Sequence, residues 1–378
     1  MMKFDVKEYL NELETIVNID SGSRVPGGAA KVADYFEAKY KALGLNVKRT
    51  VVNESLNASM LEIRNKPETE RIDVMLMGHM DTVFPDGEAV RRPFSMDDTW
   101  AYGPGVCDMK AGLLFIYHLV ENLLARGTDL SFCVLMNSDE EISSVDSQAR
   151  IKEVARMADY AFVLEPGRKN GAYVNERKGL ARYKLVVDGV AAHAGIAPQD
   201  GANAINEAAH ITLEMESLNH YDIGTSVNVG IINGGASANV VCDHVECMVD
   251  TRFEEIEEHH KIEAAFKQFS ENPRNPRTTV TFTREGFRPP MRKTEKTEAL
   301  MALMNEKGAE VGVDMKWVKT GGGSDGNFIA FEGCTVVDAA GPVGDGAHSV
   351  RECMKLDTIQ PRFTLLYNTL LALEEQKY

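Results

Sequence analysis

The sequence predicts an α/β fold with a mixed, mostly parallel central sheet, interrupted by a smaller inserted α+β domain. In the first half of the chain, short apolar segments alternate with helical segments, an order typical of a sheet covered by helices on both faces. Between about residues 179 and 289 the apolar residues instead recur with period two, as in half-exposed strands. We therefore expect a discontinuous α/β domain over residues 1–178 and 290–378, and an inserted domain over residues 179–289.

The elements of the α/β domain follow from apolar periodicity and from stop signals. An amphipathic helix is expected at the N-terminus, and Gly44 is a plausible stop for the helix that follows it. The apolar run that begins at Ile72 ends abruptly in polar residues, which indicates a buried strand. The expected elements are a helix over Lys31–Leu43, strands over Val47–Val52 and Ile72–Thr82, a helix over Met109–Gly127, and buried strands within residues 130–141 and 158–167.

The inserted domain has its own element order. We expect a strand over Ala181–Val190, a helix over Ala202–Leu218, strands over residues 226–235 and 244–253, a helix over Ile256–Phe269 and a strand over residues 277–286. This β-α-β-β-α-β order is typical of a ferredoxin-like module. After Pro289-Pro290, an apolar strand within residues 334–342 and a final helix over Thr358–Lys377 return to the α/β pattern.

Composition excludes several classes of protein. The formal charge is 41 − 57 = −16, which argues against a nucleic-acid or anionic-membrane partner. No apolar stretch approaches the about 18 residues of a membrane span, and the acidic N-terminal segment does not resemble a signal peptide. The six cysteines form no CxxC pair. We therefore expect reduced thiols and a cytoplasmic protein.

Acidic and histidine side chains stand where the predicted strands end and at two further loops. They are His79 and Asp81 in GHMDT, Asp108 in GPGVCDMK, Glu140 and Glu141 in NSDEE, Glu165 in LEPG, and His348 in GDGAHSV. Ionised carboxylates are costly to bury without a partner, and a cation holds several of them together. In open α/β sheets, ligands bind outside the carboxyl ends of the strands. The pattern therefore suggests a shared site.

Mixed histidine and carboxylate donors suit Zn²⁺, with Co²⁺ or Mn²⁺ as substitutes. Five ligands with one bridging carboxylate fit two ions about 3.5–4 Å apart. Each residue alone also fits a structural role: Asp108 as a helix cap, Glu140 and Glu141 as a solvated turn, and Glu165 as a turn residue before proline.

The order of the motifs resembles a known family. GHMDTVFP, AYGPGVCDMKAG, NSDEEISS, VLEPGR, GVAAHAGIAPQDGANAI, GGGSDGN and GAHSVRE occur in the order seen in dizinc metallopeptidases of the aminoacylase/carboxypeptidase type. The similarity spans about Val74 to Glu352 and is greatest to glutamate carboxypeptidases. Seven ordered blocks are far more specific than one short motif. The resemblance implies a zinc-peptidase-like catalytic domain and a lid or dimerisation domain.

The resemblance also implies roles for the site residues. His79, Asp108 and Glu165 would bind one Zn²⁺, and Asp108, Glu141 and His348 the other. Glu140 would be the general base, and Asp81 would orient His79. The peptide bond after Asp108 would be cis. Two positions depart from the family: Ser143 stands where many relatives have glycine, and Cys107, expected to be a small buried thiol, stands where relatives often have alanine.

Further residues match substrate-binding positions of the family. His193 would reach the active site of the other subunit and help to hold the oxyanion. Arg252 and Asn239 would bind the terminal carboxylate of the substrate, with Arg288 a weaker candidate. Gly323 and Ser324 belong to GGGSDGN, expected to be a substrate loop. This loop lacks the lysine of a P-loop, so a nucleotide site is disfavoured.

The resulting hypothesis is a homodimeric exopeptidase that carries two Zn²⁺ per chain and frees a C-terminal amino acid, with glutamate a candidate, from a peptide or N-acyl conjugate. An N-acyl-amino-acid deacylase with the same chemistry is the alternative. A catalytically silent metal-binding relative is a more distant one. We expect no nucleic-acid or membrane partner.

Overall fold

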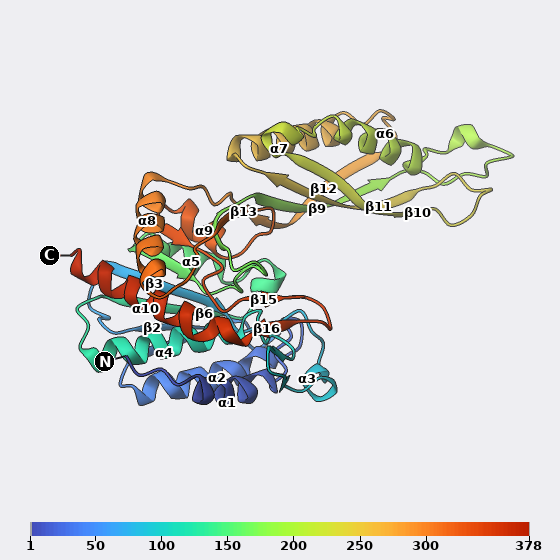
Figure 1. Cartoon of the computed structure of the whole chain (residues 1–378). Coiled ribbons are helices and arrows are strands. Elements are labelled where there is room, and N and C mark those ends of the chain that lie inside the picture. The colour runs from blue at the N-terminus through green and yellow to red at the C-terminus, as the bar shows by residue number, and fades with distance from the viewer. Residues whose placement is uncertain (1, 378) are drawn as a thin grey trace. The chain divides into compact units, whose positions relative to one another are not determined.

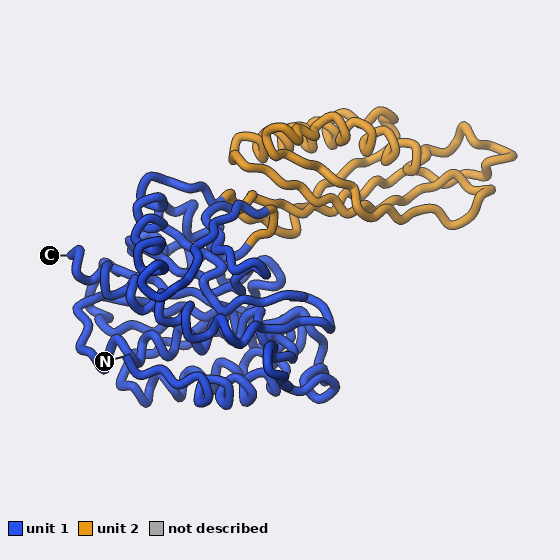
Figure 2. The backbone as a smooth tube through the Cα atoms, in the orientation of Figure 1, with its two compact units in different colours: residues 1–176, 291–320, 324–378 blue, residues 177–290, 321–323 orange. Residues whose placement is uncertain are grey.

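The computed structural model (Figure 1) describes residues 2–377, which form two compact units. Unit 1 contains the residues up to Glu176, Met291–Thr320, and the residues from Ser324 onward. Unit 2 contains Arg177–Pro290 and Gly321–Gly323. Figure 2 shows the two units in different colours. The chain thus leaves unit 1 and returns to it, and the GGGSDGN loop contributes residues to both units.

The central sheet of unit 1 has six strands in the order β1-β2-β6-β3-β7-β14. They are β1 (Asn46–Asn53), β2 (Ala58–Arg64), β6 (Phe132–Asn137), β3 (Ile72–His79), β7 (Ala158–Val163) and β14 (Thr335–Val337). The neighbours of β3 and β7 pair in parallel, whereas β1–β2 and β2–β6 pair antiparallel. The mixed, mostly parallel sheet is confirmed.

Helices cover both faces of this sheet, as predicted (Figure 1). Val74 and Leu76 of β3 pack into the core formed with α1 (Val6–Val17), α2 (Gly28–Ala42), α4 (Lys110–Arg126), α8 (Glu295–Glu310) and α10 (Ile359–Glu375). Met75 and Met77, which point the other way because strand side chains alternate, pack with α5 (Gln148–Ala155) and α9 (Gly326–Phe331). Both faces of β3 are therefore buried, which explains its continuous apolar run.

Two short sheets complete unit 1. One is ordered β15-β16-β5-β4, from β15 (Gly344–Asp345), β16 (Cys353–Lys355), β5 (Trp100–Tyr102) and β4 (Ser95–Met96). The other pairs β13 (Trp317–Thr320) with β8 (Tyr173–Arg177). The remaining short elements are α3 (Glu88–Arg91) and the 3₁₀ turns Glu140–Ile142 and Leu356–Thr358. The first sheet joins residues near position 100 to residues near 350, far apart in the sequence.

Several elements differ from the sequence predictions. Strand β2 and helix α5 were not predicted, although β2 is almost wholly buried and separates β1 from β6. The second helix begins at Gly28 rather than Lys31. The predicted strand over Ile72–Thr82 ends at His79. At the end of α4, Gly127 adopts φ 78°, the left-handed conformation expected of a C-terminal cap.

Unit 2 is the predicted ferredoxin-like module, with a sheet ordered β10-β11-β9-β12 in which all neighbours are antiparallel. Its elements are β9 (Gly179–Asp188), α6 (Ala204–Glu216), β10 (Ser226–Gly234), β11 (His244–Phe253), α7 (Ile256–Glu271) and β12 (Thr279–Arg288), with 3₁₀ turns at Pro198–Asp200 and Tyr221–Ile223. Alternate residues of β9 and β11 pack against α6 and α7. Helix α6 begins after Asn203, whose side chain accepts hydrogen bonds from the amides of Ile205 and Asn206.

Across residues 2–377, none of the helices has the length and apolar character needed to cross a membrane.

Candidate metal centre

The predicted ligands lie at one edge of the central sheet. His79 is the last residue of β3, Glu140 and Glu141 follow β6, and Glu165 follows β7. Because these three strands are parallel neighbours, their carboxyl ends meet at the same edge. Asp108 precedes α4, and His348 lies in the loop between β15 and β16.

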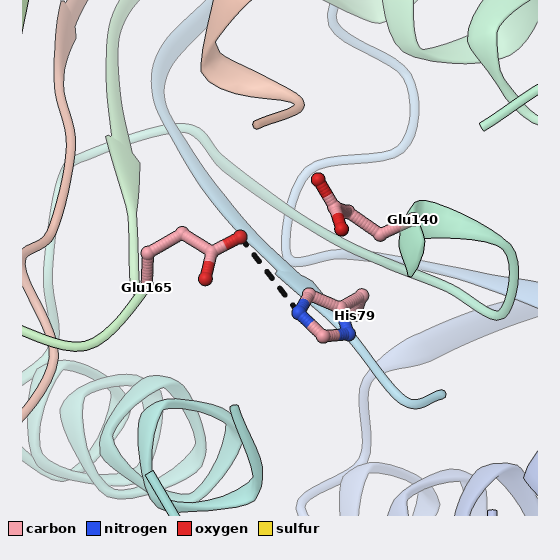
Figure 3. A group of neighbouring side chains, drawn as sticks. All are labelled: His79, Glu140 and Glu165. Atoms are coloured by element: carbon pink, nitrogen blue, oxygen red, sulfur yellow. Dashed lines mark ion pairs between the residues drawn. The ribbon is translucent and has the colours of Figure 1, made fainter. Parts of the chain in front are cut away.

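Asp108 lies between the two histidines. Its Oδ1 is 3.2 Å from Nε2 of His79, and its Oδ2 is 3.2 Å from Nε2 of His348. His348 Nε2 also lies 3.0 Å from Glu141 Oε2, and His79 Nε2 lies 3.7 Å from Glu165 Oε1 (Figure 3). One carboxylate thus faces two imidazoles, each of which has a further carboxylate beside it.

The donor atoms are close enough to share ions. Ligand atoms of His79, Glu140 and Glu165 lie within 4.8 Å of one another, and so do those of His79, Asp108 and Glu141. Figure 3 shows Glu140 and Glu165 on either side of His79. Nitrogen and oxygen donors in this arrangement fit divalent transition-metal ions.

The electrostatics of the cluster also favour added positive charge. Burial raises the pKa of the Glu165 carboxyl well above its usual value, and the Asp108 charge adds to this. Burial likewise raises the pKa of Glu141, although His348 opposes it. Hydrogen bonds to Asp108 and Glu141 raise the pKa of His348 to about 11. Since these carboxylates repel one another, a cation between them would keep all of them ionised.

Asp81 connects two parts of the cluster. Nδ1 of His79 donates to the backbone carbonyl of Asp81 over 3.0 Å, which leaves the lone pair of Nε2 directed toward Asp108. The Asp81 carboxylate accepts hydrogen bonds from the backbone amides of Glu140 (3.3 Å) and Glu141 (3.2 Å). It therefore contacts the turn that carries the two glutamates, a connection that the sequence did not predict.

The turn after β6 depends on unusual backbone angles. Ser143 has φ 76° and Ser144 has φ 50°, both in the left-handed region. Glycine adopts this left-handed conformation without strain, so the backbone at Ser143 is of the kind that favours glycine. The buried hydroxyl of Ser144 donates to Asp325, which also accepts from Asn137 Nδ2 over 2.8 Å. Asp325 was missed as a supporting residue, although it is the acid in GGGSDGN.

Two further expectations about the α/β unit, one on Asp108 and one on Cys107, are confirmed. The peptide bond between Asp108 and Met109 is cis. Cys107 is buried, at 1% exposure. Met75, Met77 and Met80 are fully buried members of the two cores.

The predicted substrate-binding residues fall mostly in unit 2. His193 is exposed and its backbone pairs with Val240, which places it beside Asn239, also exposed. The Arg252 guanidinium donates to Asp250 over 2.7 and 2.9 Å, and to the carbonyl of Gly321 over 2.9 Å. A substrate carboxylate at Arg252 would therefore meet a guanidinium already bound to Asp250.

Arg288, Gly323 and Ser324 lie around the end of the GGGSDGN loop. A Cβ at Gly323 would lie 2.7 Å from the side chain of Leu180 and 2.8 Å from that of Arg288, both in the same unit, which favours glycine there. Arg288 is buried, at 3% exposure. Ser324 belongs to unit 1, is 1% exposed, and its hydroxyl donates to Asp338. That hydroxyl contributes to the internal structure of unit 1.

Comparison with known proteins gives consistent results. The model of peptidase family M20/M25/M40 matches residues 75–372. Carboxypeptidase G2 of Pseudomonas sp. (strain RS-16) is 30% identical over 90% of this chain and 83% of its own length. The structure of a Staphylococcus aureus tripeptidase is similar with a TM-score of 0.80 at 22% identity, covering 99% of this chain and 100% of that one.

A metallo-carboxypeptidase from Sulfolobus solfataricus, Sso-CP2, also has a similar structure, with a TM-score of 0.75 at 19% identity over 98% of this chain and 99% of that one. The fold, the donor cluster and the family match agree. The chain belongs to peptidase family M20/M25/M40 and is a metallo-hydrolase that acts on peptide or amide bonds.

Proposed function

We propose that this protein is a dizinc exopeptidase that releases a C-terminal amino acid from a peptide or N-acyl conjugate. The observation that carries the proposal is the position of Asp108, whose two oxygens each face one histidine at 3.2 Å. The similarity to carboxypeptidase G2 supports release from the C-terminal side. Glutamate is our candidate for the released amino acid.

In this proposal His79, Asp108 and Glu165 bind one Zn²⁺, and Asp108, Glu141 and His348 bind the other. Co²⁺ or Mn²⁺ would be substitutes. Bound ions would polarise the scissile carbonyl and lower the pKa of a water molecule between them. The donor set fits this chemistry, because each histidine lies within 4 Å of a carboxylate that is not shared.

Glu140 is the proposed general base. Its backbone is held by Asp81, and its carboxylate faces the His79 side of the cluster (Figure 3). It would accept a proton from the attacking water and later donate it to the leaving amine. A carboxylate so close to His79 and Glu165 could alternatively serve as a ligand, so its role requires a test that separates metal binding from turnover.

Glu140→Gln should retain the metal content of the parent protein and lose most turnover, because the amide cannot accept the proton. Metal content would be measured by elemental analysis after reconstitution with Zn²⁺, and turnover with a panel of peptides. Glu141→Gln serves as the matched variant and should lose metal. Metal loss in Glu140→Gln, or turnover close to that of the parent, would overturn the assignment of the base.

We further propose that residues 1–178 and 290–378 form the catalytic domain and that residues 179–289 form a lid and dimerisation domain. Edge strand β10 and helix α6 carry exposed apolar side chains, among them Ile231 (53% exposed), Ile232 (54%) and Leu213 (71%), which supports a homodimer through this module. A sedimentation mass equal to one chain would contradict it. His193 would act in the site of the other subunit.

The substrate carboxylate would be bound by Arg252 and Asn239, with Gly323, Ser324 and Arg288 nearby. An N-acyl-amino-acid deacylase is the alternative, since the cleaved bond is chemically the same. Product analysis on folyl-glutamate, acetyl-amino-acid and dipeptide panels, with Zn²⁺, Co²⁺ and Mn²⁺, separates the two. A cytoplasmic location also remains a proposal, supported by the scattered cysteines.

A further inference from the structure

Glu352 is a buried acid that the proposed mechanism does not use. Its side chain is only 1% exposed. Its Oε2 accepts a hydrogen bond from the backbone amide of Gly105 over 2.9 Å. Its Oε1 accepts from the amides of Cys107 and Asp108, each over 3.0 Å. One carboxylate therefore satisfies three backbone donors of the loop that ends at Asp108.

This contact joins two segments that carry candidate ligands. Glu352 lies four residues after His348 and directly before β16, whereas the loop from Gly105 to Asp108 precedes α4. The same two segments meet again where His348 Nε2 lies 3.2 Å from Asp108 Oδ2. The hydrogen bonds between the Glu352 carboxylate and the loop amides thus connect the same two segments that carry the candidate ligands Asp108 and His348.

A second buried charged residue, Lys110, also binds the backbone of this loop. The buried Lys110 ammonium donates to the carbonyls of Pro104 (3.2 Å) and Ile19 (2.8 Å). Lys110 thus binds a carbonyl of the loop while Glu352 binds its amides. Since charge-assisted hydrogen bonds are the stronger ones, the backbone from Pro104 to Asp108 has little freedom.

We propose that Glu352 is a positioning residue, which holds the Asp108 carboxylate between His79 and His348 and so sets the affinity of the shared metal site. The proposal rests on the proposed function, because it takes Asp108 as the bridging ligand. Outer residues that orient metal ligands typically change metal affinity or activity 10–100-fold when substituted.

Glu352→Gln tests the proposal while keeping the size of the side chain. Its amide group would place N–H donors against backbone N–H donors, so the loop would move. Titration with Zn²⁺ alone should show the weaker of two sites losing about 10–100-fold in affinity. With peptide substrate, kcat should fall by a similar factor at limiting Zn²⁺, with KM changed little, and should recover in part at high Zn²⁺.

Glu374→Gln is the matched control. Glu374 is also a buried acid (8% exposed) and accepts hydrogen bonds from Arg126, Thr128 Oγ1 and the Asp129 amide, away from the predicted ligands. It should lower thermal stability to a similar degree and leave the Zn²⁺ affinity and kcat of the parent unchanged. A merely structural role for Glu352 predicts the same behaviour for Glu352→Gln.

The visible absorption spectrum of the Co²⁺-loaded protein adds a readout of coordination geometry. It should change in Glu352→Gln, and by a smaller but measurable amount in Glu352→Asp, which keeps the charge but is one methylene too short to reach all three amides. If Glu352→Gln does not fold, the comparison of Glu352→Asp with the parent decides: unchanged Zn²⁺ affinity and an unchanged spectrum overturn the inference. If the parent itself binds fewer than two ions, the proposed function fails instead.

Discussion

At the scale of single residues, the turn after β6 shows how this chain positions two acidic side chains without the expected glycine. Ser143 and Ser144 both adopt positive φ, which costs a non-glycine residue about 1–2 kcal/mol. Ser144 contributes a buried hydrogen bond to Asp325, whereas no hydrogen bond of the Ser143 hydroxyl is present within residues 2–377. The two neighbouring serines should therefore respond differently to substitution.

Ser144→Ala should lower the free energy of unfolding by about 1–3 kcal/mol, because the buried Asp325 loses a donor. Ser143→Gly is the paired variant and should change stability by less than about 1 kcal/mol, since relief of strain offsets the greater chain entropy of glycine. Urea denaturation of both variants checks this. Equal losses in the two variants would contradict the account.

At the scale of elements, α4 lies unusually close to the end of β7. A Cβ built at Gly112 of α4 would lie 2.1 Å from the backbone carbonyl oxygen of Leu164, the residue before Glu165. Backbone cannot move aside as a flexible side chain can, so this glycine sets the distance between the helix that follows Asp108 and the strand that precedes Glu165.

Gly112→Ala should destabilise the protein by about 1–3 kcal/mol through overpacking and should weaken Zn²⁺ binding, because it displaces two ligand-bearing segments. Gly321→Ala is the control: no heavy atom lies near its added Cβ, so stability should change by less than about 0.5 kcal/mol. Thermal unfolding and Zn²⁺ titration measure both effects. A Gly112→Ala variant as stable as the parent would contradict the close approach of α4 to the Leu164 carbonyl.

The titratable His259 of helix α7 lies in an aromatic cluster with Phe253 of β11 and Phe287 of β12. The ring of His259 packs at 4.9 Å from Phe253 and 4.7 Å from Phe287, and the residue is 2% exposed. Burial lowers its pKa to about 4, although Glu263 opposes the shift. The folded protein therefore keeps this imidazole neutral at pH values where the unfolded chain, with a pKa of about 6.5, takes up a proton.

The difference in the pKa of His259 between the folded and unfolded chains makes stability fall as the pH is lowered. The contribution of His259 to stability is complete above about pH 6.5 and is lost as the pH falls toward about 4, by about 2 kcal/mol at pH 5. His259→Phe should remove this part of the acid sensitivity, whereas His260→Gln, an exposed neighbour on the same helix, should not. Denaturation midpoints at about pH 7.5 and pH 5 make the comparison. If His259→Phe loses as much stability between about pH 7.5 and pH 5 as the parent protein does, the burial of His259 is not the cause.

At the scale of the whole molecule, the metal centre ties distant parts of the chain together. Its candidate ligands come from positions 79 to 348 and meet at one sheet edge. An ion that binds only the folded state stabilises it by about 2.7 kcal/mol at one hundred times its dissociation constant. Chelation should therefore lower the melting temperature, and added Zn²⁺ should restore it.

The rise in melting temperature that Zn²⁺ produces should be smaller in Glu141→Gln, which lacks one donor. It should be unchanged in Glu374→Gln. Differential scanning calorimetry at fixed protein concentration, with and without Zn²⁺, gives both values. A melting temperature independent of Zn²⁺ in the parent protein would contradict a structural contribution from the ions.

The sequence alone was sufficient for the fold class and for much of the donor cluster. Apolar runs that end in His79, Glu141 and Glu165 predict neighbouring strand ends, because the carboxyl ends of parallel strands gather at one edge. The period-two pattern of residues 179–289 likewise predicts the ferredoxin-like module, and both predictions agree with the sheets of the structure. Asp108 and His348 joined the set as acidic and histidine side chains in loops, and the ordered motifs then implied their roles as ligands.

Tertiary structure alone decided the rest. The hydrogen bonds that Glu352 accepts from the Asp108 loop span more than 240 residues of sequence, and no local pattern encodes a contact of that separation. The contact of Ser144 with Asp325 and the placement of β2 between β1 and β6 are of the same kind. Local periodicity indicates which side chains must be buried, whereas their partners are settled only when distant segments of the chain pack together.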